Sequence, residues 1–305
     1  MFGLKKQKSD DTDTKVTAEK KKRKKQTAEL EPQYYMSATN MPVMNYNVYY
    51  FSILEKIGYF LAAFAVGAAV GYLFYGGIGK DEYGQATMLT HVLNIVIPVS
   101  VGLIAGKLFL PVRNQQIIDR NKGMLARQFR DMLDGLTTSL GAGNNIPNSF
   151  MSVQKDMKVQ YEEGTFILQE LDVIVEGFRN AIPIEQTLND FGRRSGNDDI
   201  KSFANVFEVC NRQGGNIQDV IRNTHEILSD KMAVKEDIET VVTSSKNEQN
   251  MMLFMPVLLV GMIKLSSDDF GAYFATPVGV ICTTFGVIMF IIAYFVGKKM
   301  LDIKL

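Results

Sequence analysis

The residue types that most often carry chemistry are sparse in this chain. Among its 305 residues are two histidines, His91 and His225, and two cysteines, Cys210 and Cys282. His91 lies at the end of an apolar stretch and His225 lies in a helical pattern, and neither has a cysteine or a carboxylate at the spacing of a metal site. No serine, threonine or cysteine lies in a recognisable nucleophile motif. The sequence therefore predicts no catalytic residue, no metal site and no cofactor.

Phosphate chemistry is not indicated either. The glycine-rich stretch Gly214-Gly215-Asn216 lacks the pattern G-x-x-x-x-G-K-[ST] of a phosphate-binding loop, so we do not expect the chain to hydrolyse ATP. Acidic pairs such as Glu162-Glu163 and Asp198-Asp199 can dock a basic partner or hold a divalent cation, but solvated helix faces are the favoured explanation. We expect a protein that is not an enzyme.

Four apolar stretches set the architecture. They cover about residues 58–79, 91–110, 251–266 and 277–296. A bilayer core needs about 20 apolar residues in a helix, a length that the third stretch does not reach. The pattern predicts an all-α membrane protein. Four transmembrane helices form two hairpins, residues 57–110 and 251–297, which flank a helical bundle over residues 111–250.

Positive charge predicts the orientation. A lysine-rich segment precedes the first stretch, whereas the two short connections inside the hairpins are acidic, so both termini and residues 111–250 are expected in the cytoplasm. Residues 1–50 are expected to form a disordered tail, and residues 298–305 form a second tail. A basic run, Lys20, Lys21, Lys22, Arg23, Lys24 and Lys25, either binds anionic lipid, at about 1 kcal/mol per charge, or serves only as a topology signal. Nucleic acid is not an expected partner.

Within residues 111–250 the joints between predicted helices repeat. Two copies of G-x-x-N-x-I-P occur, and glycine can close a helix in the left-handed conformation while proline suits the first turn of the next helix. A third joint pairs two glycines with an asparagine that suits the N-cap of the following helix. The joint residues are Gly141, Gly143, Asn144 and Pro147, then Gly177, Asn180 and Pro183, then Gly214, Gly215 and Asn216.

The helix after the third joint is expected to run from Ile217 to about Glu248 and on into the third apolar stretch, with a kink at Pro256. Such a helix is a stiff connection between the bundle and the membrane. In the first apolar stretch Ala63, Gly67 and Gly71 form a stripe of small residues, and Gly279 begins a weaker stripe in the fourth. These stripes predict close helix packing, either between copies of the chain or within its own hairpins.

Several segments together resemble a known family, the type II secretion F domain of bacterial inner-membrane platform proteins. The resemblance covers about residues 110–305. It is carried by Leu140-Gly141-Ala142-Gly143, Glu176-Gly177, Ile184-Glu185-Gln186-Thr187-Leu188, Asn197-Asp198-Asp199-Ile200, Gln213-Gly214-Gly215-Asn216-Ile217, Asp219-Val220-Ile221, Met255-Pro256, Thr276-Pro277-Val278-Gly279 and Gly297-Lys298-Lys299. One soluble domain with four spans is similar to the Tad (tight adherence, or Flp pilus) branch, and more to its TadB-type than its TadC-type members. Asn148-Ser149-Phe150 departs from the family's usual step.

The resemblance implies a platform protein of the inner (cytoplasmic) membrane. Such a protein couples a separate hexameric secretion ATPase to the assembly of pilin subunits, and it works with a sister platform protein of the TadC type and with further copies of itself. The runner-up interpretation is a membrane-anchored signalling or adaptor module that binds cytosolic partners through its bundle.

Overall fold

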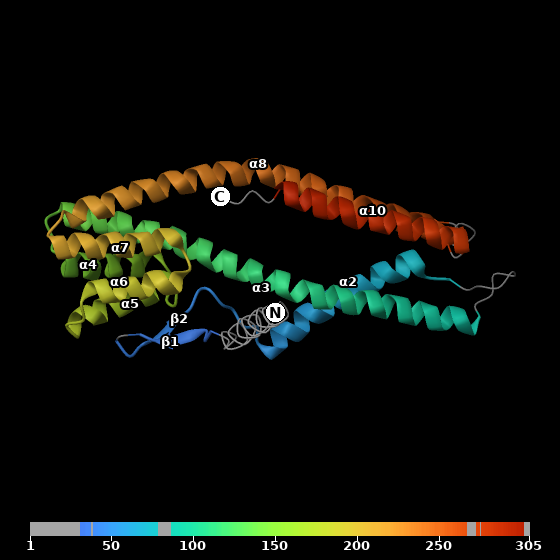
Figure 1. Ribbon diagram of the computed structural model, residues 1–305, viewed down its shortest axis with the longest axis horizontal. Coiled ribbons are helices and arrows are strands. Elements are labelled where there is room, and N and C mark those ends of the chain that lie inside the picture. The colour runs from blue at the N-terminus through green and yellow to red at the C-terminus, as the bar shows by residue number, and fades with distance from the viewer. Residues whose placement is uncertain (1–30, 38, 79–86, 267–272, 275, 302–305) are drawn as a thin grey trace, which may run out of the picture.

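The computed structural model describes residues 31–37, 39–78, 87–266, 273–274 and 276–301, which are mostly helical (Figure 1). The expectation of an all-α protein is confirmed. The elements are β1 (Tyr34–Met36), β2 (Pro42–Met44), α2 (Ile53–Tyr75), α3 (Met88–Gly141), α4 (Ile146–Gln160), α5 (Phe166–Arg179), α6 (Ile184–Ser195), α7 (Asp198–Gln213), α8 (Ile217–Ser266) and α10 (Pro277–Leu301).

The molecule is elongated, with a helical bundle at one end and apolar helices at the other (Figure 1). Two long helices, α3 with 54 residues and α8 with 50 residues, belong to both ends. The boundaries expected at residues 111 and 250 therefore lie inside unbroken helices. The continuity predicted for α8 is confirmed, and α8 contains Pro256 without a break, just as α3 contains Pro98 and Pro111.

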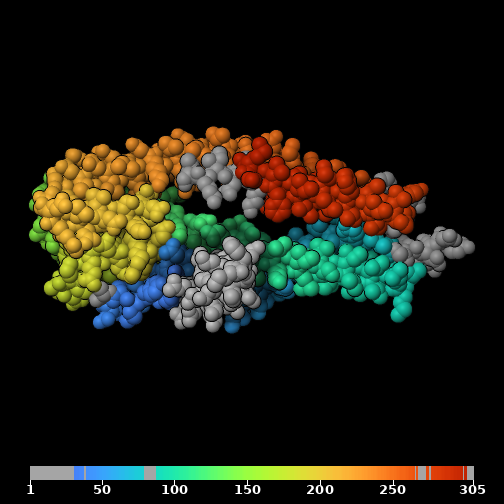
Figure 2. All heavy atoms as spheres, in the orientation of Figure 1, coloured from blue at the N-terminus to red at the C-terminus, as the bar shows by residue number. Residues whose placement is uncertain are grey.

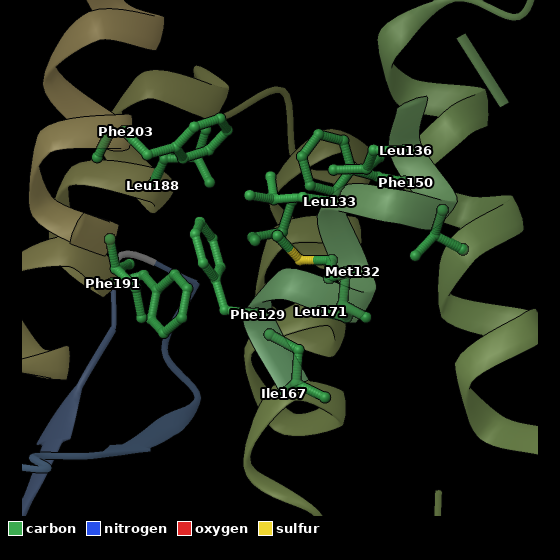
Figure 3. Packing of buried hydrophobic residues seen from close by; sticks show 14 of the residues in the cluster. Phe129, Met132, Leu133, Leu136, Phe150, Ile167, Leu171, Leu188, Phe191 and Phe203 are labelled. Atoms are coloured by element: carbon green, nitrogen blue, oxygen red, sulfur yellow. The ribbon is translucent and has the colours of Figure 1, made fainter. Parts of the chain in front are cut away.

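The bundle has one apolar core, built by α4 to α7 together with the adjoining halves of α3 and α8. Phe129 of α3 is fully buried and lies edge-on to Phe203 of α7 and Phe191 of α6, with ring centroids 5.4 and 6.0 Å apart (Figure 3). Apolar residues recur along α3 at steps of three and four, a spacing that predicts one inward helix face. The members of that face, Leu125, Phe129, Met132, Leu133 and Leu136, have no exposed surface. Removing such side chains from water is the main contribution to the stability of the bundle.

Three of the described helices are long and apolar enough to cross a membrane: α2, α3 and residues 277–297 of α10. The apolar end of α8 is not one of them, in line with the short length of the third apolar stretch. The described residues thus provide three candidate spans of a multi-pass membrane protein.

Helices α2 and α3 pack closely through small residues. A β-carbon added to Gly67 of α2 would lie 3.1 Å from the α-carbon of Gly102, and one added to Gly71 would lie 3.2 Å from the α-carbon of Pro98. Gly67 of α2 approaches Gly102 of α3, and Gly71, one turn later in α2, approaches Pro98, one turn earlier in α3. The two helices are therefore antiparallel. Gly67 and Gly71 are buried and Ala63 is half-buried, which places the predicted stripe within the chain's own helix pair.

The α8–α10 pair is looser. Space around Gly286 of α10 is open, and nothing lies within 4 Å of a β-carbon added there. Pro256 of α8 and Gly279 of α10 are both half-buried, and a β-carbon added to Gly279 would clash with the backbone of Tyr273. The two pairs meet near the end far from the bundle, where the Tyr75 and Thr284 hydroxyls lie 3.2 Å apart. Figure 2 shows the surface hollowed between α8 and α3, midway along the molecule.

Residues 31–50 differ from the expected disordered tail. Strands β1 and β2 form an antiparallel hairpin with Tyr35 opposite Val43, turned at Asn40 with a φ of 59°. A two-stranded hairpin of this size is marginal on its own in water. It is ordered here because Tyr46, with 1% of its surface exposed, belongs to the apolar core of the bundle and Met44 packs against that core. Residues 1–30, including the run Lys20–Lys25, and residues 302–305 lie outside the described part.

Candidate functional site: the helical bundle and its N-terminal strap

The first repeated joint uses two of its predicted residues, Gly143 and Pro147, in the expected way. Helix α3 ends at Gly141, and the left-handed conformation falls on Gly143, with a φ of 88°. Asn145, and not Asn144, caps α4, because its side-chain oxygen accepts a hydrogen bond of 2.9 Å from the Asn148 amide. Pro147 lies in the first turn of α4, as predicted.

The second joint shares the sequence pattern but not the geometry. Gly177 is inside α5, and a β-carbon there would lie 3.0 Å from the Thr187 methyl group, so this glycine permits close packing of α5 on α6. The left-handed residue is Ala181, with a φ of 54°. Asn180 ends α5 and Pro183 immediately precedes α6. The two joints are therefore alike in sequence and in position between helices, but not in backbone conformation.

The third joint agrees with its prediction. Gly214 ends α7 in the left-handed conformation, with a φ of 69°. Gly215 lies against Cys210, whose sulfur would be 2.6 Å from a β-carbon on that glycine. The Asn216 side chain accepts a hydrogen bond of 3.1 Å from the Gln218 amide and so caps the start of α8. This joint fixes where the long helix begins.

A buried ion pair lies where the N-terminal segment meets the bundle. The Arg194 guanidinium of α6 donates two hydrogen bonds to the Glu170 carboxylate of α5, at 2.8 and 2.7 Å, and both side chains are 2% exposed. The Arg194 Nε donates to Asp190 at 2.8 Å. The Tyr46 hydroxyl donates to Glu170 at 3.0 Å, and the Tyr46 ring lies edge-on to Phe166 at 5.3 Å. Every charged group of this cluster has partners, as burial requires.

The electrostatics of the cluster keep its protonation states fixed. Burial, and then the charge of Glu170, raise the pKa of the Tyr46 phenol, so the phenol stays protonated and donates its hydrogen bond. Burial alone would lower the pKa of Arg194, but the hydrogen bonds and charge of Glu170 outweigh burial and raise the pKa, so the guanidinium stays charged. The cluster is thus a permanent ion pair that receives a neutral tyrosine.

Backbone groups complete the attachment. We call residues 31–47 the strap. The Tyr46 amide donates to the Arg194 carbonyl at 3.0 Å, and Arg194 donates in return to the Met44 carbonyl at 2.9 Å. Lys122 of α3 donates to the Asn47 side chain at 2.9 Å. The strap therefore joins α3, α5 and α6, five residues before α2 begins.

An open groove of about 910 Å³ lies between the strap and helices α6 and α7. Met36 and Ser37 form one wall, and the other carries Asp190 and Glu208 with their arginine partners Arg193 and Arg212, paired at 2.8 and 2.7 Å. The two arginine side chains are 79% and 72% exposed, so most of their donors remain free for a ligand. Most of the residues that line the groove are polar or charged, so it offers hydrogen-bonding groups to a polar ligand.

The residues considered first for chemistry do not come together. His225 of α8 lies 3.7 Å from Asp134 of α3, and its ring nitrogen is 3.4 Å from the Ser229 hydroxyl. Cys210 and Cys282 are separate free thiols. Among the described residues no group of three or more metal-ligating side chains forms. The candidate site of the described bundle is therefore the groove beside the strap, which is a surface for binding.

Sequence reasoning did not identify Tyr46, Glu170 or Arg194. A signal was present, because residues 33–50 are rich in tyrosine and carry Met-Pro-Val-Met, and aromatic and branched residues favour strands. Nothing in the sequence indicates that Glu170 pairs with Arg194, since the two lie on different helices. Comparison of the chain with protein-family models, with curated proteins and with solved structures gave no match.

Proposed function

We propose that this chain is the platform protein of a Tad-type (Flp) pilus or of a type II-like secretion machine. In this role it lies in the inner membrane with both termini in the cytoplasm. It couples a cytoplasmic hexameric secretion ATPase to pilin assembly, together with a sister platform protein and further copies of itself. Anionic lipid binds its basic run. The resemblance set out above supplies this hypothesis.

The observation that carries the proposal is the continuity of α3 and α8. Each helix belongs to the bundle at one end and to the apolar region at the other, with no loop between. A movement imposed on the bundle by a cytoplasmic motor therefore reaches the membrane through helix backbone, which is stiff. Platform function needs this coupling and needs no catalytic group in the platform itself.

The proposal includes four spans in two hairpins. Residues 251–266 of α8, at about 1.5 Å each, give about 24 Å, which is shorter than the bilayer core of about 30 Å. Local thinning of the bilayer accommodates such a mismatch at modest cost. Lys264 supports this placement, because its ammonium is 3.5 Å from the Gly76 carbonyl at the end of α2 and can reach the interface.

Two measurements test the proposal. A cysteine at Gln169 or Glu208, in a variant with Cys210 and Cys282 replaced by serine, should react with a membrane-impermeant maleimide only after the cells are opened. Reaction in intact cells would contradict the topology.

Deletion of the gene in its native host should abolish pili, and complementation should restore them. Normal pili in the deletion strain would exclude the platform role.

A second function is favoured by the groove beside the strap. A membrane-anchored adaptor also needs a polar binding surface on its bundle, and the exposed Arg193 and Arg212 provide one. Crosslinking in membranes from residues between Gly214 and Arg222 discriminates the two: capture of a secretion ATPase favours the platform, and capture of a signalling enzyme favours the adaptor.

A further inference from the structure

We propose that the Glu170–Arg194 pair and its surroundings form a peptide-binding site whose ligand is the chain's own strap, held reversibly. The chemistry of the ligand is an extended segment with one tyrosine and a free backbone carbonyl two residues before it. In this structure Tyr46 and the Met44 carbonyl fill those two roles.

The site has the features of a recognition pocket. Its two charged side chains are 2% exposed and are fixed by each other and by Asp190. Glu170 accepts from Arg194 and still accepts from the Tyr46 phenol, while Arg194 has one further donor for the Met44 carbonyl. Three of these five residues, Glu170, Arg194 and Asp190, belong to the bundle, so the pocket is formed by the bundle and completed by the strap. Aromatic and arginine residues in such desolvated positions dominate binding energy at interfaces.

The strap has the features of a ligand. Within the described part of the chain, its strands pair with each other alone in a two-stranded sheet, and three residues each are too few to hold that sheet without support. Tyr34 and Met36 are 60% and 69% exposed, so β1 contributes little burial. Docking of Tyr46 into the core of the bundle, with Met44 packed against that core, therefore decides whether the strap is ordered, which makes the segment an order–disorder element.

Release of the strap has a structural consequence. Asn47 is tied to Lys122, and only residues 48–52 separate the strap from α2. While the strap is docked, the start of α2 is held to α3 and α6. When it leaves, α2 keeps its packing on α3 but loses its link to α6, and one wall of the groove at Met36 and Ser37 is removed. The strap thus controls the shape of the polar groove.

Hydrogen exchange on the full chain in nanodiscs tests the first step. Tyr46→Ala should raise exchange over residues 33–47 to the level of an unfolded segment while α3 and α5 to α7 keep their protection. Tyr34→Ala, which alters a tyrosine of the same strap with 60% of its surface exposed, is the matched control and should leave exchange unchanged. Tyr46→Phe, which loses only the hydrogen bond to Glu170, should give an intermediate increase. Unchanged exchange in Tyr46→Ala overturns the proposal, and so does loss of protection across the helices, because the strap would then be an inseparable part of the core.

Binding in trans tests the second step. A fluorescent peptide of residues 31–50 should bind the Tyr46→Ala chain, whose pocket is empty. It should bind the unaltered chain at least roughly tenfold more weakly, because a filled pocket reduces the apparent affinity by the fraction that is free. The same peptide carrying alanine in place of Tyr46 should bind neither. Equal binding to both chains, or no binding to the Tyr46→Ala chain, contradicts a peptide-binding pocket.

Discussion

The bundle and the α2–α3 pair are packed by opposite means. The bundle fills its interior with large side chains such as Phe129, Phe150 and Phe207, each fully buried. The α2–α3 pair instead brings backbones together at Gly67, Gly71, Gly102 and Gly106. Apolar side chains gain from contact with one another in water, whereas among lipid tails they gain little, so close approach of small residues provides the contact there. The location of an interface along α3 therefore determines which residues can form it.

The largest effect should follow from emptying the centre of the bundle. Phe129→Ala removes a ring that contacts two other phenylalanines, and a cavity of this kind costs about 3–5 kcal/mol of folding free energy. We expect the bundle to unfold at a much lower temperature, while labelling of cysteines introduced into α2 and into residues 88–110 of α3 changes little. Circular dichroism during heating measures the first effect, and loss of the α2–α3 contacts as well would show that the two regions do not fold separately.

A smaller effect is expected where backbones approach. Gly102→Val places a side chain 2.8 Å from the Phe64 ring and 2.9 Å from the Phe64 carbonyl oxygen, and overpacking of this kind costs about 1–3 kcal/mol. Gly286→Val is the matched control, because space around Gly286 is open. Thermal unfolding in detergent should separate the two variants. Equal melting temperatures would mean that glycine is not what holds α2 against α3.

At the joints between the helices of the bundle, glycine acts in a third way, through the backbone conformation that it permits. Gly143→Ala should destabilise the bundle by about 1 kcal/mol, because an ordinary residue resists the left-handed region. Gly141, two residues earlier, has no positive φ, and a β-carbon there meets only the side-chain Nε2 of Gln218, at 3.7 Å. Gly141→Ala should therefore be neutral or slightly stabilising. Denaturant unfolding compares the pair, and the reverse order would refute the assignment of the turn to Gly143.

The smallest effect concerns pH. Burial and a hydrogen bond to Asp131 raise the pKa of Tyr161 to about 12, above its ordinary value of 10.0. A raised acid pKa means that the protonated phenol stabilises the fold. The contribution is complete below pH 10.0 and is lost as the pH rises toward about 12. Stability should therefore fall more steeply between these values in the unaltered chain than in Tyr161→Phe, as denaturant titrations at each pH can measure. Parallel curves would mean that Asp131 does not hold the phenol.

The sequence was sufficient to predict features that depend on the residues of a single helix and its ends. It identified the inward residues of α3, the continuity of α8, and the cap at Asn216. It could not place the left-handed residue of the second joint, because Ala181 adopts a conformation that its type disfavours and that only its surroundings impose. It also could not find the Tyr46 pocket, since that pocket brings together residues from distant segments whose separate patterns are unremarkable. Contacts between segments that are distant in the sequence could be identified only from the three-dimensional structure.

The unbroken length of α3 has a geometric consequence. Its 54 residues at 1.5 Å each span about 80 Å, most of the way from one end of the molecule to the other. A tilt of about 5° at the bundle end shifts the opposite end sideways by about 7 Å, which approaches the distance of about 8–10 Å between the axes of two packed helices. A small change of angle in the bundle is thus large enough, at the distant tip, to displace a neighbouring helix by most of its own width.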